Sequence, residues 1–156
     1  MSRSLARVTR ALAEARIASV PLEMAEGTRT AEDAAAAVGC GIDQIVKSMI
    51  FQGAASGRVF LFLTAGSKRV DAARAAALAG EALVRADADT VRAQTGFAIG
   101  GVSPVGLVQQ VPVWMDRRLL DFDTVWAAAG TPRHVFAAAP QDIARASGAV
   151  AAGFTA

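Results

Sequence analysis

An eleven-residue stretch rich in glycine, Gly96–Gly106, constrains the fold of this chain more than any other part of the sequence. It contains four glycines, one proline and one serine, and it lies between two apolar segments. Glycine permits positive φ angles and has no side chain to keep a ligand from the backbone, whereas Pro104 stiffens the exit of the stretch. The sequence therefore predicts a tight loop with an open backbone.

Two interpretations of this loop fit the sequence. In the first, its backbone N–H groups bind an oxyanion or a phosphate, as turn nests do. In the second, it is a tight β-turn in a small barrel and binds nothing. The stretch lacks the Lys-Ser/Thr ending of a P-loop and the spacing of a G-x-G-x-x-G motif, so neither nucleotide-binding motif is present.

Composition indicates a folded chain with one domain over residues 1–156. Hydrophobic residues make up 53% of the chain and charged residues 19%, which is typical of a globular protein. No apolar run approaches the roughly 18 residues that a membrane span needs, and the first residues contain no apolar secretory segment. We therefore expect a cytoplasmic protein that does not bind membranes.

The sequence predicts neither a metal site nor a cofactor. Cys40 is the only cysteine, which excludes an internal disulfide and a multi-cysteine zinc site. We expect it to be a small core residue. His134 is the only histidine, so any Ser/His/Asp or Cys/His constellation would have to use it. Its position in an expected strand favours a structural or surface role, and no His/Asp/Glu spacing suggests a metal.

The charge pattern leaves two possibilities for the N-terminal segment. The net charge is only +2, which argues weakly for a nucleic-acid partner. Arg3, Arg7 and Arg10 share one face of an expected helix, opposite Leu5 and Val8. This face is either a stripe that binds phosphates or the solvated side of an ordinary amphipathic helix.

The order of expected elements indicates an α+β fold with a mostly antiparallel sheet. Helix patterns cover residues 2–19, 30–39, 71–79, 87–95 and 140–148, the second with a capping-box-like start at Thr30 and the last with proline at its start and glycine at its end. An extended segment spans residues 20–25, and strand patterns cover residues 44–52, 59–64, 82–85, 111–115, 124–128 and 133–138. Gly53–Gly57 is expected to turn the first two strands into a hairpin.

Lys47 interrupts an apolar strand and therefore calls for an explanation. Alternation places Lys47, Met49 and Phe51 on one face and Val46, Ser48 and Ile50 on the other. A buried ammonium needs a partner, because burying it alone is costly. The alternative is that the side chain reaches solvent at the edge of the strand.

Three segments together resemble the YbaK family, whose members are free-standing relatives of the editing domain of bacterial prolyl-tRNA synthetases. The segments are Thr30–Gly39, the lysine strand Gln44–Phe51 and the glycine loop from Gly100 to Gly106. The resemblance extends over roughly residues 20 to 150, through Pro112–Asp116 and Pro140–Ile143. It implies a single α+β domain with a mixed, mostly antiparallel, barrel-like sheet flanked by short helices.

The resemblance also implies an activity, which is hydrolysis in trans of the ester that joins a wrong amino acid to the 3′-terminal adenosine of a tRNA. The strand lysine of the family approaches the terminal phosphate or ribose, and its G-x-x-x-P loop borders the scissile ester. By this resemblance we expect Lys47, Gly100 and Gly101 to act in catalysis. The residues expected to bind substrate are Ser48, Ser103, Pro104, Gly106 and Asp116.

An aminoacyl ester is already labile, so a positioned water and donors aimed at the developing oxyanion suffice without a protein nucleophile. Ser48 stands where alanine-specific members tend to have an amide, which leaves the edited amino acid unassigned. The small side chains near the loop favour a small or hydroxyl-bearing residue, namely alanine, serine or threonine. The expected partner is aminoacylated tRNA. A short protein of this kind could also rely for tRNA recognition on an aminoacyl-tRNA synthetase or an elongation factor. The alternatives are a non-catalytic nucleic-acid-binding module and a small-molecule pocket protein.

Overall fold

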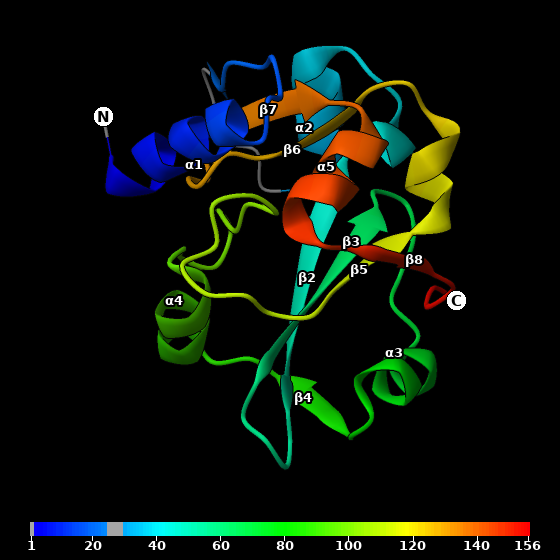
Figure 1. Ribbon diagram of the computed structural model, residues 1–156. Helices are drawn as coiled ribbons and strands as arrows, with labels where there is room; N and C mark the ends of the chain where they lie inside the picture. The colour runs from blue at the N-terminus through cyan, green and yellow to red at the C-terminus, as the bar shows by residue number, and fades with distance from the viewer. Residues whose placement is uncertain (1, 25–29) are drawn as a thin grey trace.

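The computed structural model describes residues 2–24 and 30–156, and Figure 1 shows how they are arranged. The helices of these residues are α1 (Arg3–Glu14), α2 (Ala31–Val38), α3 (Ala72–Ala79), α4 (Ala88–Thr95) and α5 (Pro140–Ser147), with short 3-10 helices at Ile42–Gln44 and Arg117–Asp121. The strands are β1 (Leu22–Glu23), β2 (Val46–Gly53), β3 (Val59–Ala65), β4 (Leu83–Arg85), β5 (Val113–Asp116), β6 (Val125–Ala128), β7 (His134–Ala138) and β8 (Val150–Ala152).

The strands form two sheets rather than one closed barrel. The larger sheet has the order β4-β2-β3-β5-β8, and the smaller has the order β1-β7-β6. Pairing is antiparallel throughout the smaller sheet and from β4 to β3, but β3, β5 and β8 run parallel. A parallel bridge between Ile45 and Trp126 joins the two sheets next to β2. The expected α+β fold with a mixed, mostly antiparallel sheet is confirmed.

The β2–β3 hairpin confirms the predicted alternation. Its register pairs Val46 with Ala65 and continues without interruption to Gln52 and Val59. Leu61 and Leu63 of β3 enter the main core, whereas Phe60 and Phe62 enter a second cluster on the opposite face. Because side chains alternate along a strand, β3 is buried on both faces, which explains its uninterrupted apolar sequence.

The main core lies between one face of the β2–β3 hairpin and the helices that cover it. Its fully buried side chains come from α1, α4, α5, β6, β7 and the glycine loop; they include Val8, Leu12, Val91, Phe97, Val125, Phe136 and Ile143. The second cluster stacks Phe62 on Trp114 with ring centroids 5.0 Å apart. The glycine loop is thus attached to the core through Phe97 and Val102, not suspended in solvent.

The helix boundaries follow the capping residues in the sequence. The Thr30 hydroxyl accepts a hydrogen bond from the backbone N–H of Asp33 at 3.1 Å, and α2 ends at Gly39 with φ of 75°. The first helix ends at Glu14, earlier than predicted, because Arg16 adopts a left-handed conformation with φ of 58°. The strand β8 follows Gly148 and was not predicted. Residue 25 of the predicted extended segment lies outside the described residues.

Two structural features are absent from the described residues. No helix there is both long and apolar enough to cross a membrane. No group of three or more His, Cys, Asp or Glu side chains in the same residues is arranged to hold a metal ion.

Candidate active site

A pocket of about 570 Å³ opens where β2, β6, β7, the start of α2 and the glycine loop meet. Three of the residues predicted from the sequence line it, namely Lys47, Ser48 and Gly100. They come from segments more than 50 residues apart in the chain. The other polar or charged lining side chains are Thr30, Glu32, Ser67, Arg69, Thr131 and His134, and the apolar part includes Ile45, Val46, Val102, Trp126 and Val135.

The pocket borders the edge of β2 that faces away from β3. The backbone N–H of Gly53 bonds to Arg58, across the hairpin, whereas that of Ala54 bonds to Ala82, on the side of β4. Because this direction alternates along an antiparallel strand, the backbone N–H and C=O of Ser48 point away from β3, toward the pocket. On the side away from β3, β4 pairs only with Phe51–Gly53, so no described strand pairs with β2 at Ser48 on that side. We call this segment the open edge of β2.

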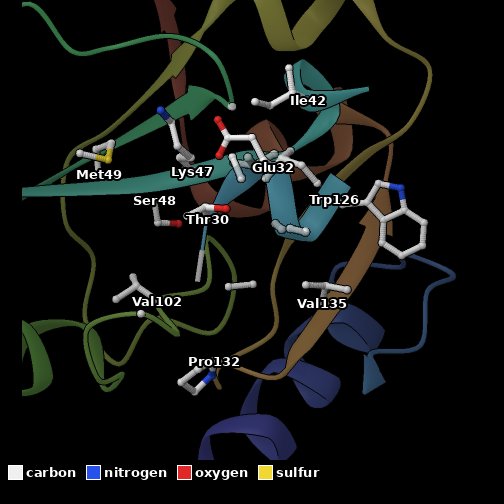
Figure 2. Close-up of a pocket in the computed structure, with 18 of the residues that line it drawn as sticks. Thr30, Glu32, Ile42, Lys47, Ser48, Met49, Val102, Trp126, Pro132 and Val135 are labelled. Carbon is white, nitrogen blue, oxygen red and sulfur yellow. The ribbon is translucent and has the colours of Figure 1, made fainter. Parts of the chain in front are cut away.

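Lys47 and Ser48 leave the open edge on opposite faces of the strand. Figure 2 shows the Lys47 side chain on the same side as Glu32, and the Ser48 side chain on the other side, toward Val102 of the glycine loop. Adjacent residues of a strand always point to opposite faces. The pocket therefore wraps around the edge of β2, with a cation on one face and a hydroxyl on the other.

The Lys47 side chain is half-buried, and its amine is held by the backbone. Its Nζ donates a hydrogen bond to the carbonyl oxygen of Lys68 at 2.6 Å. Burial lowers the pKa of the Lys47 ammonium, and the positive charge of Arg69 adds to this effect, whereas the carboxylates of Glu32, Asp43 and Asp116 oppose it. The sequence left two interpretations of Lys47, a buried ammonium with a partner or a side chain that reaches solvent. Neither fits entirely, because the amine is hydrogen-bonded to a carbonyl oxygen and Lys47 still lines the pocket.

The Ser48 hydroxyl is buried without a hydrogen-bond partner among the described residues. An unpartnered buried hydroxyl is costly and uncommon in a folded protein. Ser48 also lines the pocket, so this unpartnered hydroxyl lies in the pocket wall.

Gly100 and Gly101 occupy different environments in the glycine loop. Gly100 has φ of 94°, in the left-handed region, and a Cβ built on it would have no heavy atom within 4 Å. A Cβ on Gly101 would lie 2.9 Å from the Cα atom of Thr131. Gly100 thus leaves open space at the pocket, and Gly101 allows the loop to pack against the turn before β7.

The other predicted site residues lie away from the pocket lining. Ser103 is fully buried, and its hydroxyl accepts a hydrogen bond from the backbone N–H of Val105 at 3.1 Å. Pro104 is buried, and Gly106 packs against the backbone of Arg7 and Val8 in α1. Asp116 accepts hydrogen bonds from the backbone N–H groups of Ala65 and Arg118. All four contribute to the structure around the pocket rather than to its surface.

Sequence reasoning missed several polar residues of the pocket. His134, expected to be structural or on the surface, lines the pocket, and its Nδ1 lies 2.6 Å from the Thr131 hydroxyl. Glu32 was read only as part of a helix start. Glu32 comes from α2, His134 from β7 and Thr131 from the turn before β7. Folding brings these segments together, so no local spacing in the sequence could have grouped them.

A lysine, a strand edge and a glycine loop of an α+β fold thus surround one pocket, and the described residues contain no cluster arranged to hold a metal ion. Comparison with known families identifies the class. Residues 25–146 match the model of the aminoacyl-tRNA editing domain, and the chain belongs to this family.

Known relatives cover between 80% and 100% of the chain. A candidate trans-editing enzyme for prolyl-tRNA synthetase, known from a crystal structure, is 42% identical in sequence to this chain. The two structures superpose with a TM-score of 0.90, and the match covers 100% of this chain and 99% of that one. The hypothetical protein APE2540 is 31% identical, with a TM-score of 0.86 over 96% and 99% of the two chains. The uncharacterized protein YwhH of Bacillus subtilis (strain 168) is 30% identical over 80% of this chain and 79% of its own length.

Proposed function

We propose that the protein is a trans-acting aminoacyl-tRNA deacylase that hydrolyses the ester at the 3′-terminal adenosine of mischarged tRNA. One observation carries the proposal. Lys47, Ser48 and Gly100 line the same pocket, so a cation for the polynucleotide and an open backbone for the ester lie within one site. Membership of the editing-domain family and the likeness to a candidate trans-editing enzyme support it.

The geometry of the open edge suggests how the substrate lies. The terminal phosphate or ribose binds the Lys47 ammonium on one face of β2, and the ester crosses the edge toward Gly100 and the loop on the other face. Lys47 retains donors beyond the one bonded to Lys68, because an ammonium has three N–H groups. The substrate thereby contacts β2 on both faces.

The reaction itself needs little from the side chains. A water oxygen attacks the carbonyl carbon, and the bond to the ribose oxygen breaks. The products are the free amino acid and a tRNA whose ribose oxygen has received the proton. Gly100, with Gly101 behind it, borders the ester with backbone groups that stabilise the developing oxyanion. Holding ester and water together supplies the rest of the rate enhancement.

The Ser48 hydroxyl selects the acyl group in this proposal. It is buried and unpartnered among the described residues, and it faces the loop side of the pocket. A hydroxyl-bearing amino acid such as serine or threonine would supply the missing hydrogen bond, whereas alanine would leave it unmade. We therefore place hydroxyl-bearing amino acids ahead of alanine among the expected substrates.

A panel of mischarged tRNAs tests the proposal. Each tRNA carries a labelled amino acid, and release of the label is followed with and without protein. Release above the spontaneous rate from at least one member, with seryl or threonyl esters fastest, is the expected result. Binding without release from any member would identify a nucleic-acid-binding module instead, and absence of both would leave the pocket to a small molecule.

A further inference from the structure

Arg7 of α1 is bound to both ends of the glycine loop. Its Nε donates a hydrogen bond to the carbonyl oxygen of Gly106 at 2.8 Å, and its Nη2 donates one to that of Gly96 at 2.6 Å. The guanidinium carbon also lies 4.6 Å from the centre of the Phe97 ring. Arg7 is half-buried, while Arg3 and Arg10 are exposed. The sequence interpretation of three equivalent arginines is therefore wrong for Arg7.

The middle of the loop is also supported by α1, through a second segment. A Cβ on Gly130 would lie 2.8 Å from the carbonyl oxygen of Ser4, so the turn before β7 is packed directly on α1. Thr131 follows in this turn, and Gly101 packs against its backbone. The helix thus fixes the ends of the loop by hydrogen bonds and its middle by packing.

The two carbonyl groups that Arg7 binds lie on either side, in the chain, of the loop residues that line the pocket. Gly100 and Val102 line the pocket, and they lie between the two carbonyl groups that Arg7 binds. A Cβ on Gly96 would lie 2.5 Å from Nη2 of Arg7, so the guanidinium fills the space that a side chain would need. Two hydrogen bonds from a planar guanidinium set a direction as well as a distance.

We propose that Arg7 is a positioning residue for the deacylation reaction, which holds the backbone of the glycine loop in the arrangement that stabilises the oxyanion. This inference rests on the proposed function. Arg7 does not line the pocket, so it acts through the loop. Its loss is expected to lower kcat about 10- to 100-fold with little change in KM, because a displacement near 1 Å is enough for such a loss.

The test compares Arg7→Ala and Arg7→Lys with Arg10→Ala in steady-state deacylation of the tRNA that the wild type cleaves fastest. Arg10 is an exposed arginine of the same helix, and unlike Arg7 its side chain has no hydrogen bond to the glycine loop among the described residues. We expect wild-type kcat for Arg10→Ala and a reduced kcat for both Arg7 variants. Lysine keeps the charge and the aliphatic part of the side chain. Its single ammonium does not reproduce the two separate N–H donors of the guanidinium that reach the carbonyl groups of Gly96 and Gly106.

Two further measurements separate positioning from general stability. Hydrogen exchange of the variants is expected to increase at residues 96–106 and to stay unchanged in β3 and β5. Millimolar methylguanidinium is expected to restore part of the kcat of Arg7→Ala and to leave Arg10→Ala unaffected. A wild-type kcat in the folded Arg7→Lys variant, or faster exchange spread over the whole chain, would overturn the inference. A wild type that cleaves no tRNA would overturn the proposed function, whereas the exchange result would still report whether Arg7 holds the loop.

Discussion

The ammonium of Lys47 donates a hydrogen bond to the backbone carbonyl oxygen of Lys68 at 2.6 Å. This bond fixes the amine before any substrate arrives, so less side-chain entropy remains to be lost on binding. The carbonyl belongs to the loop after β3, whose Ser67 N–H is bonded to Asp43 at 3.0 Å. The cation of the site is thus positioned by two layers of hydrogen bonds.

Removal of the Lys47 side-chain amine is expected to weaken tRNA binding. Lys47→Met keeps the apolar stem, and we expect kcat/KM for the preferred mischarged tRNA to fall about 10- to 100-fold, the effect of one hydrogen bond to a charged group. The control is Lys68→Ala, because Lys68 contributes its backbone carbonyl, which the substitution leaves in place. Equal losses in both variants would contradict a specific role for Lys47.

The lowered pKa of Lys47 predicts the direction of a pH effect. In the proposed function the charged form binds the phosphate, and this form is lost as pH rises through the pKa of Lys47 in the folded protein, which burial places below that of a lysine in water. The affinity for deacylated tRNA is therefore expected to fall with rising pH in the wild type, and to do so at a lower pH than an ordinary lysine would give. Lys47→Met should be weak and nearly independent of pH. Parallel curves for the two proteins would count against the assignment.

Two serines of the site region are expected to respond in opposite ways to replacement by alanine. Ser48→Ala removes an unpartnered buried hydroxyl, so we expect an unchanged or raised Tm and a loss of up to about tenfold in kcat/KM for seryl or threonyl esters. Ser103→Ala removes a hydroxyl that is bonded to Val105, so we expect about 1 kcal/mol less stability. Thermal unfolding and a comparison of seryl with alanyl esters check both. A Ser48→Ala variant with unaltered preference would refute the selection role.

Neighbouring glycines of the loop offer a matched pair for separating activity from stability. Gly100→Ala puts a methyl group into open space at the pocket, at a backbone strain cost of about 1 to 2 kcal/mol. Gly101→Ala pushes a methyl group against the backbone of Thr131, and overpacking of this kind costs about 1 to 3 kcal/mol. We expect a larger loss of kcat in the first and a larger loss of Tm in the second. The reverse order would mean that the loop at Gly100 does not border the ester.

Local sequence signals predicted most elements of this fold and the β2–β3 hairpin, but not the other strand pairings. Thr30 and Gly39 delimit α2, and the alternation around Lys47 holds through the hairpin. The parallel pairing of β5 with β3 and β8 was missed, because three-residue β8 has little strand signal and partner choice depends on packing between distant segments. Division into two sheets follows from the same long-range contacts.

The candidate site was predictable only in part. Lys47, Ser48 and Gly100 were found because each breaks a local pattern or matches a family motif. Arg7 looked like its neighbours in α1, and only the folded loop shows that its guanidinium points inward. His134 joins the pocket because β7 pairs with β6, which lies next to β2, and this arrangement has no counterpart in residue spacing.

Consecutive residues on the two faces of one strand have a consequence for how such a protein can diversify. Under the proposed function, a substitution at Ser48 would change the environment of the acyl group, while Lys47, whose side chain leaves the opposite face of β2, would still bind the polynucleotide. Single-codon changes at position 48 would then alter which mischarged tRNA is hydrolysed without changing the surface that receives the nucleic acid.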